Sequence, residues 1–368
     1  MVRQSLELDD VAAYDYEDRH SSYDDDEDAV PLVGGASRIP LTFIDDNTES
    51  RGCSPFFYYV AALLIAVMVG AIVLVPAQTV PSRGHEQLQC ELDITSNTSW
   101  TTFLHTIGNS ADSRCDEPEG RPCECLNPLV GQKPLYNAER WENAVAINLD
   151  YIKNATNKQL DVVLIGDSIT EHWHGTDLGQ PEPAYADNVG VYEQLFDLQK
   201  GADVSGLALG VGGDRCPQLL YRLQNGEMPP SLQPSIWWVL VGTNDKASDK
   251  CKNEDVIAGN IAIVQEILER RPRATVVINS LLPRGNDRSL YWWQEYTAIN
   301  DALACYASGM DRVEFFNATD LFVTRDGQAL NLTLLPDELH PTEMGSWIWG
   351  RAIVAKVQEI LRKQTRKE

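Results

Sequence analysis

The sequence predicts an α/β fold, a doubly wound parallel sheet with helices on both faces. Five short apolar runs alternate with helical patterns after Trp141, at residues 161–165, 204–209, 236–241, 274–281 and 312–316. The runs are continuously apolar, so we expect both faces of the sheet to be buried. Apolar residues recur at helical spacing between runs, as from Val256 to Leu268, and again from Trp347 to Leu361. Right-handed crossovers between such strands place ligands beyond the carboxyl ends of the strands.

Composition limits the domain organisation and the partners. The 368 residues allow two domains or one large domain with appendages, and 43% hydrophobic residues suffice for a core. The formal net charge of -24 argues against nucleic acid as a partner, since phosphate binding needs clustered Lys and Arg. In the first 54 residues, fourteen acidic side chains oppose four basic ones. We therefore expect residues 1–54 to be a disordered acidic tail in the cytosol.

Residues 55–77 are predicted to form one transmembrane helix. No charged residue lies between Arg51 and Arg83, and the 20 residues from Phe56 to Val75 are almost entirely apolar. Such a helix crosses the roughly 30 Å hydrocarbon core, and the four aromatic residues at its start resemble an interfacial belt. A cleavable signal peptide is the alternative, but signal peptides begin with a short basic region and not with a long acidic tail. We expect an uncleaved signal anchor.

Sequons and cysteines predict on which side of the membrane the rest of the chain lies. The candidate glycosylation sequons all follow the span, at Asn97, Asn154, Asn317 and Asn331. Seven of the eight cysteines also follow it, which is typical of an oxidising compartment. We expect a single-pass type II membrane protein of the secretory pathway (Golgi, endomembrane or plasma membrane) with a lumenal or extracellular catalytic domain.

Residues 78–135 are predicted to form a lumenal stem, and residues 136–368 the catalytic domain. Four cysteines in the stem indicate a segment tied by disulfides, whose pairing the sequence leaves open; they are Cys90, Cys115, Cys123 and Cys125. The Cys123-x-Cys125 spacing has no second cysteine pair or nearby histidine, so zinc is not expected. Cys305 falls in an apolar helical pattern and is interpreted as a buried small hydrophobic side chain.

Polar motifs follow the predicted strands at the edge where ligands are expected. They are Gly166-Asp167-Ser168 after the first strand, Gly210-Val211-Gly212-Gly213-Asp214 after the second, Gly242-Thr243-Asn244-Asp245 after the third, and Asp337-Glu338-Leu339-His340 before the last helix. Each motif alone is typical of an ordinary turn or helix cap. Their order, each at the expected edge of the sheet, favours a catalytic site.

The residue types fit nucleophilic catalysis. A serine hydroxyl is a weak nucleophile, so Ser168 needs a base, which His340 can provide. Asp337, three residues before the histidine, is placed to fix the tautomer and orientation of the imidazole. The backbone N–H groups of Ser168 and Gly213 and the side-chain amide of Asn244 are the expected oxyanion donors.

Neither a cofactor nor a metal is expected. The glycine loop lacks the lysine of a phosphate-binding loop and the spacing of a dinucleotide fingerprint. His172 and His174 have no carboxylate cluster nearby in the sequence, so they are interpreted as loop residues.

These motifs resemble those of the SGNH (GDSL-type) esterases, most closely the catalytic subunits of the intracellular platelet-activating-factor acetylhydrolases. The resemblance rests on GVGGD and the following LLYRLQNGE, on WWVLVGTND, on LLPRG and on DELHP, and it covers about residues 136–362. It implies a flavodoxin-like three-layer sandwich with a five-stranded parallel sheet. It also implies Ser168 as nucleophile, Gly213 and Asn244 as oxyanion donors, Asp337 as orienting carboxylate and His340 as base.

The chain departs from those acetylhydrolases, which are soluble and cytosolic, in its predicted span and stem. Cys216 follows the glycine loop and Cys251 lies beyond the asparagine loop. We expect both cysteines near the site and predict a disulfide between them.

The sequence thus predicts a membrane-anchored serine esterase that hydrolyses a short-chain ester, acetyl above all, of a lipid or a glycan. One alternative is a lumenal glycan O-acyltransferase, which resolves the same acyl-enzyme with a sugar hydroxyl. Another is a catalytically silent module that binds carbohydrate or lipid, against which the intact Ser168, Asp337 and His340 argue. The expected partners are the acyl-ester substrate and the membrane, and the sequence is compatible with a homo-oligomer.

Overall fold

The computed structural model describes residues 100–110, 113–116, 123–135, 137–155, 159–247, 250–285 and 291–366. The chain divides into a unit up to Ser82 and a unit from Arg83 to Glu368, and the described residues all belong to the second. The predicted tail at 1–54, the predicted span at 55–77 and the sequon at Asn97 lie outside the described ranges. No helix within those ranges is both long and apolar enough to span a bilayer.

The five predicted strands form one parallel sheet, as expected. They are β1 (Val162–Gly166), β4 (Gly206–Gly210), β5 (Ile236–Leu240), β6 (Thr275–Asn279) and β7 (Val313–Phe316). Their order across the sheet is β4-β1-β5-β6-β7, and every neighbouring pair is parallel. The strand order reverses between β1 and β5, and in such sheets the binding crevice lies at that reversal. A separate antiparallel hairpin joins β2 (Thr176–Asp177) to β3 (Gln180–Pro181).

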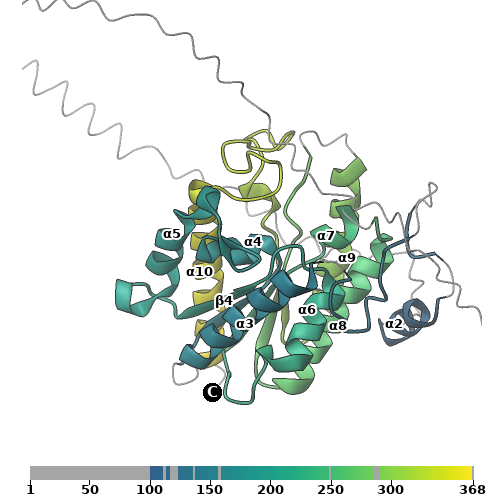
Figure 1. The fold of residues 1–368 in the computed structure, drawn as a ribbon, viewed down its shortest axis with the longest axis horizontal. Helices are drawn as coiled ribbons and strands as arrows, with labels where there is room; N and C mark the ends of the chain where they lie inside the picture. The colour runs from purple at the N-terminus through teal and green to yellow at the C-terminus, as the bar shows by residue number, and fades with distance from the viewer. Residues whose placement is uncertain are drawn as a thin grey trace, which may run out of the picture. The chain divides into compact units, whose positions relative to one another are not determined.

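Helices cover both faces of the sheet, which confirms the predicted α/β class. On one side α5 (Asn188–Phe196) packs against α10 (Glu343–Thr365); on the other lies a layer of α6 (Cys216–Arg222), α8 (Asn253–Arg270) and α9 (Tyr291–Ser308) (Figure 1). Helix α3 (Ala138–Ala155) precedes β1 and contacts β4. Two short helices, α4 (Ser168–Glu171) and α7 (Thr243–Ala247), directly follow β1 and β5.

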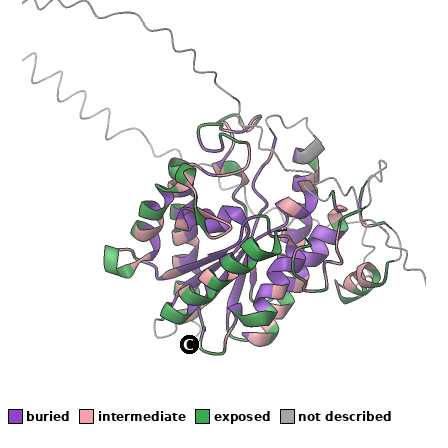
Figure 2. Ribbon diagram, viewed as in Figure 1, coloured by how far each residue is buried: buried purple, intermediate pink, exposed green. Residues whose placement is uncertain are grey.

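The core lies between these layers. Every residue of β1, β5 and β6 is buried, and the buried residues in Figure 2 follow the sheet and the helix faces that cover it. Two tryptophans of this core keep their polar atoms satisfied, because the indole N–H groups of Trp238 and Trp349 both donate to Asn279 Oδ1 at 3.1 Å. The continuous apolar runs in the sequence thus reflect a sheet buried on both faces.

A buried ion cluster joins the carboxyl ends of β1 and β4. The guanidinium of Arg222, at the end of α6, is fully buried and pairs with Asp214 at 2.7 Å and with Glu227. It also donates to the carbonyl oxygens of Gly166 at 2.8 Å and of Leu209 at 3.3 Å. Gly166 ends β1 and Leu209 lies at the end of β4, so one cation ties two adjacent strands at the edge where the polar motifs lie.

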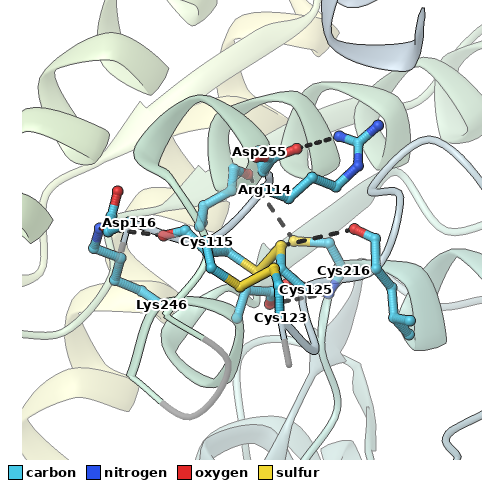
Figure 3. Close-up of a disulfide and its surroundings, with 12 residues drawn as sticks. Arg114, Cys115, Asp116, Cys123, Cys125, Cys216, Lys246 and Asp255 are labelled. Carbon is cyan, nitrogen blue, oxygen red and sulfur yellow. Dashed lines mark hydrogen bonds and ion pairs between the residues drawn. A yellow bond between two sulfur atoms is a disulfide. The ribbon is translucent and has the colours of Figure 1, made fainter. Parts of the chain in front are cut away.

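The predicted Cys216–Cys251 disulfide is wrong. Cys251 pairs with Cys125, Cys115 pairs with Cys123, and the thiol of Cys216 is free and buried (Figure 3). Cys216 cannot reach Cys251 because its side chain packs against Gly259 and Asn260 of α8. Cys251 is instead bonded to Cys125, which belongs to a segment that precedes the catalytic domain.

The described part of the predicted stem packs on the catalytic domain. Helix α2 (Trp100–Asn109) contacts α8, and the Trp100 ring meets Tyr306 of α9 edge-on with centroids 5.3 Å apart. Cys305, beside that tyrosine, is only partly buried and is disulfide-bonded, so its interpretation as a buried small hydrophobic side chain is wrong. Helical spacing indicated an apolar environment for Cys305, but it carries no information about a disulfide.

We expect Arg222→Met to lower the free energy of unfolding by about 3–5 kcal/mol, because Asp214 and Glu227 would remain buried without their cation. Urea denaturation followed by tryptophan fluorescence measures this loss. The control, Lys133→Met, removes an exposed ion pair with Glu142 and is expected to cost less than about 1 kcal/mol. Equal losses in the two variants would contradict a structural role for the buried cluster.

Candidate active site

Ser168 begins α4 immediately after β1, in a turn that requires glycine at its start. A Cβ on Gly166 would lie 2.2 Å from the Leu240 carbonyl oxygen of the neighbouring strand β5, so a larger residue would force the strands apart. The Asp167 carboxylate caps α4 by accepting the Ile169 N–H at 3.0 Å. Burial raises the pKa of this carboxyl to about 7. The close approach of β1 and β5 therefore places Ser168 at the carboxyl edge of the sheet.

The structure brings Ser168, His340 and Asp337 together, although 172 positions separate the serine from the histidine. Ser168 Oγ lies 2.9 Å from His340 Nε2, and Nδ1 of the same ring lies 2.6 Å from Asp337 Oδ2. The other carboxylate oxygen of Asp337 accepts the backbone N–H groups of His340 at 2.7 Å and of Leu339 at 3.0 Å. The turn at residues 337–340 thus holds the carboxylate and the imidazole in one orientation.

The charge of Asp337 fixes the tautomer of His340. Partial burial alone would raise the pKa of Asp337, but the hydrogen bond and charge of His340 outweigh it and lower that pKa to about 2. The carboxylate is therefore ionised at neutral pH and can only accept a hydrogen bond, so Nδ1 carries the proton. Nε2 then faces Ser168 with a lone pair, which is the arrangement that a general base requires.

Gly213 and Asn244 follow the two strands that flank β1. Gly213 has a φ of +75°, which L side chains rarely adopt, and a Cβ there would meet no atom within 4 Å. Asn244 lies in α7 after β5, and its Nδ2 donates to the Asp214 carbonyl oxygen at 3.0 Å. An amide nitrogen carries two hydrogens, so this bond uses one of them. The two predicted oxyanion residues thus lie in the segments that follow the neighbours of β1, Gly213 in the loop after β4 and Asn244 in α7 after β5.

Glu171 is a buried carboxylate that sequence reasoning missed. It accepts four hydrogen bonds from nearby loops, namely from the N–H groups of Gly212 (2.6 Å), Leu178 (3.0 Å) and Gly179 (2.7 Å) and from the Thr176 hydroxyl (3.0 Å). Burial raises the pKa of Glu171, and the hydrogen bonds act in the opposite direction. The carboxylate thereby connects the Ser168 turn, the glycine loop and the β2–β3 hairpin. Its only signal in the sequence was its position, three residues after Ser168.

His172 and His174 form a 3-10 turn and not the expected loop. The His172 ring stacks on Tyr185 with centroids 3.5 Å apart and lies 4.6 Å from the His340 ring. Burial lowers the pKa of His172, so this imidazole is neutral at neutral pH. His174 Nε2 lies 2.9 Å from the Ala208 carbonyl oxygen. Within the described residues, no group of three or more His, Cys, Asp or Glu side chains could hold a metal ion.

Comparisons relate the chain to known proteins. Residues 164–348 match the model of the GDSL-like Lipase/Acylhydrolase family. The platelet-activating factor acetylhydrolase IB subunit alpha1 of Homo sapiens is 28% identical over 219 residues, which cover 60% of this chain and 84% of that protein. Subunit alpha2 of Homo sapiens is 29% identical over 195 residues, which cover 53% and 75%. A solved structure, a putative platelet activating factor from Streptococcus pneumonia, is 21% identical with a TM-score of 0.46, over 60% of this chain and 93% of that one.

We expect Glu171→Gln to lower the turnover of p-nitrophenyl acetate by about 10- to 100-fold, because a slight displacement of catalytic groups has a cost of this size. The glutamine amide keeps the volume, but its nitrogen donates and cannot accept the N–H groups of the glycine loop. The matched control, Glu142→Gln, alters an exposed carboxylate and should leave turnover unchanged. Full turnover in a folded Glu171→Gln variant would show that this carboxylate does not position the site.

Proposed function

Since the chain belongs to the GDSL-like lipase/acylhydrolase family and is a carboxylic ester hydrolase, we propose that it is a membrane-anchored serine esterase. Its proposed substrate is a short-chain ester, acetyl above all, of a lipid or a glycan. The relatives that are named acetylhydrolases support the acetyl group. The single observation that carries the mechanism is the hydrogen-bonded series from Ser168 Oγ through His340 to Asp337.

Acylation begins when Ser168 Oγ attacks the ester carbonyl carbon and His340 Nε2 takes the hydroxyl proton. The carbonyl oxygen becomes an oxyanion, which accepts hydrogen bonds from the N–H groups of Ser168 and Gly213 and from the Asn244 amide. Collapse of this intermediate breaks the bond to the alcohol, which leaves with the proton from His340. Asp337 remains ionised throughout and stabilises the imidazolium.

Deacylation repeats these steps with water. His340 takes a proton from the water molecule as it attacks the acyl carbon, the oxyanion forms at the same donors, and Ser168 leaves with the proton. The alcohol must lie beside His340 to receive its proton in the first half-reaction. Two aromatic rings lie near His340, that of His172 with its centroid at 4.6 Å and that of the half-buried Tyr185 at 5.7 Å.

We expect Ser168→Ala to reduce p-nitrophenyl acetate hydrolysis by the full chain by about 10⁴-fold or more, because no acyl-enzyme can form. A fluorophosphonate probe should label the unaltered chain and not the variant. The control, Ser308→Ala, replaces an exposed serine at the end of α9 and should retain both properties.

Esters of increasing acyl length test the substrate class, and hydrolysis should decline from acetate to longer chains. Reaction in the presence of a sugar acceptor tests the fate of the acyl group. A hydrolase should pass the acyl group to water even when the sugar is present. Undiminished hydrolysis in Ser168→Ala would refute the mechanism.

We further propose a single-pass type II arrangement, with residues 55–77 as the anchor and the catalytic domain in the lumen or outside the cell. The two disulfides among the described residues support an oxidising compartment. The asparagines of three candidate sequons lie in the described ranges, where Asn154 and Asn317 are exposed and Asn331 is partly exposed. This accessibility supports glycosylation, which requires a surface asparagine.

We expect the chain made in eukaryotic cells to stay in the membrane pellet after alkaline carbonate extraction and to migrate faster after treatment with an N-glycosidase. Each of Asn154→Gln, Asn317→Gln and Asn331→Gln should remove one glycan from the electrophoretic ladder. Asn225→Gln alters an exposed asparagine outside any sequon and should change nothing. Release by carbonate would contradict the anchor, and a mobility unaffected by the glycosidase would contradict the lumenal placement.

A further inference from the structure

Helix α7, which carries the oxyanion candidate Asn244, is held in place by its neighbours. A helix of five residues forms too few internal hydrogen bonds to be stable alone. Three of its residues have partners on other elements: Thr243 Oγ1 lies 2.8 Å from the Tyr296 hydroxyl of α9, Asn244 donates to Asp214 O at 3.0 Å, and the Asp245 carboxylate accepts the Cys216 N–H of α6 at 3.1 Å. The position of the Asn244 amide therefore depends on contacts outside α7.

The fourth anchor is Lys246, whose side chain is fully buried. Its ammonium pairs with Asp116 and, at 3.0 Å, with Glu295 of α9, and it donates to the Cys251 carbonyl oxygen at 3.2 Å. Burial alone would lower the pKa of Lys246, but the two carboxylates outweigh it and raise that pKa. The ammonium is therefore charged and pairs with two partly buried carboxylates at once.

Asp116 belongs to a segment that we call the strap, residues 113–116 and 123–125, which precedes the catalytic domain. The strap is fixed to the residues between α7 and α8 by the Cys125–Cys251 disulfide. Two backbone hydrogen bonds add to this attachment, from Asp116 N–H to Lys250 O at 3.0 Å and from Lys252 N–H to Arg114 O at 2.8 Å. Figure 3 shows the disulfides between two ion pairs, that of Asp116 with Lys246 and that of Arg114 with Asp255 of α8.

We propose that Lys246 is a positioning residue for Asn244, and that the strap sets the geometry of the oxyanion site through the Asp116–Lys246 pair. The inference rests on the proposed function, because it concerns the same site. Lys246 lies two residues after Asn244 in one helical turn, so a shift of the lysine moves the amide with it. Since the strap is covalently attached through Cys125–Cys251, reduction of that disulfide frees Asp116 to move and lowers turnover as well.

A double-mutant cycle on the full chain tests this inference. Lys246→Met, which keeps the length of the side chain, should lower kcat for p-nitrophenyl acetate by about 10- to 100-fold and leave KM nearly unchanged, because the oxyanion donor acts in the transition state. In the Asn244→Ala background, Lys246→Met should have little further effect. A merely structural role would instead lower turnover by the same factor in both backgrounds, and that result would overturn the proposal.

Further variants distinguish an effect of the strap on kcat from a general loss of stability. Asp116→Asn removes one of the charges that pair with the Lys246 ammonium, so it should lower kcat less than Lys246→Met does. This effect, too, should disappear in the Asn244→Ala background. The double variant with Cys125→Ala and Cys251→Ala, which lacks the disulfide, should also lower kcat. The matched control, Lys356→Met, removes a lysine of α10 that also pairs with two carboxylates, Glu314 and Glu359, and should leave kcat unchanged.

Hydrogen–deuterium exchange tests the positioning role of Lys246 independently of catalysis. Backbone amides of residues 242–252 should exchange faster in Lys246→Met than in the unaltered chain, and those of β1 should not. Failure of the unaltered chain to hydrolyse esters would refute the proposed function alone. Unchanged exchange at residues 242–252 would refute the role of Lys246, whether or not the chain is an active esterase.

Discussion

The buried guanidinium of Arg222 is the interaction on which the catalytic edge of the sheet depends. It neutralises Asp214 and Glu227 and donates to carbonyl oxygens at the ends of β1 and β4. The serine turn follows β1 and the glycine loop follows β4, so the two motifs keep their separation only while these strand ends stay together. Buried cations of this kind require complete pairing, since an unpaired charge in the core is costly.

Around this centre, acidic side chains hold segments of the candidate site in place. Glu171 accepts the N–H of Gly212, and Asp245 accepts that of Cys216. Asp337 accepts the N–H of His340 and so holds the turn at residues 337–340. A carboxylate can accept several hydrogen bonds, which allows one side chain to fix a loop that has no regular structure of its own. The site is thus organised by carboxyl groups that accept backbone hydrogen bonds.

Much of this arrangement could be predicted from particular residues. The runs at 161–165 and 236–241 correspond to β1 and β5 because strands buried on both faces are continuously apolar. The motifs of Ser168 and Asn244 were located because polar residues directly after such strands share one edge of the sheet, and that of His340 because it directly precedes the last helix. The partners of Cys251, Cys305 and Glu171 could not be predicted, because each of their contacts joins segments whose relative position depends on packing.

The sequence by itself determined the class of fold and the residues of the candidate triad, since apolar periodicity and short motifs are local properties of the chain. Only the tertiary structure decided which cysteine meets Cys251, and that Asp116 reaches Lys246 from a segment outside the catalytic domain. The physical reason is that burial of a charge or formation of a disulfide depends on what surrounds a residue in space. No pattern along the chain records those surroundings.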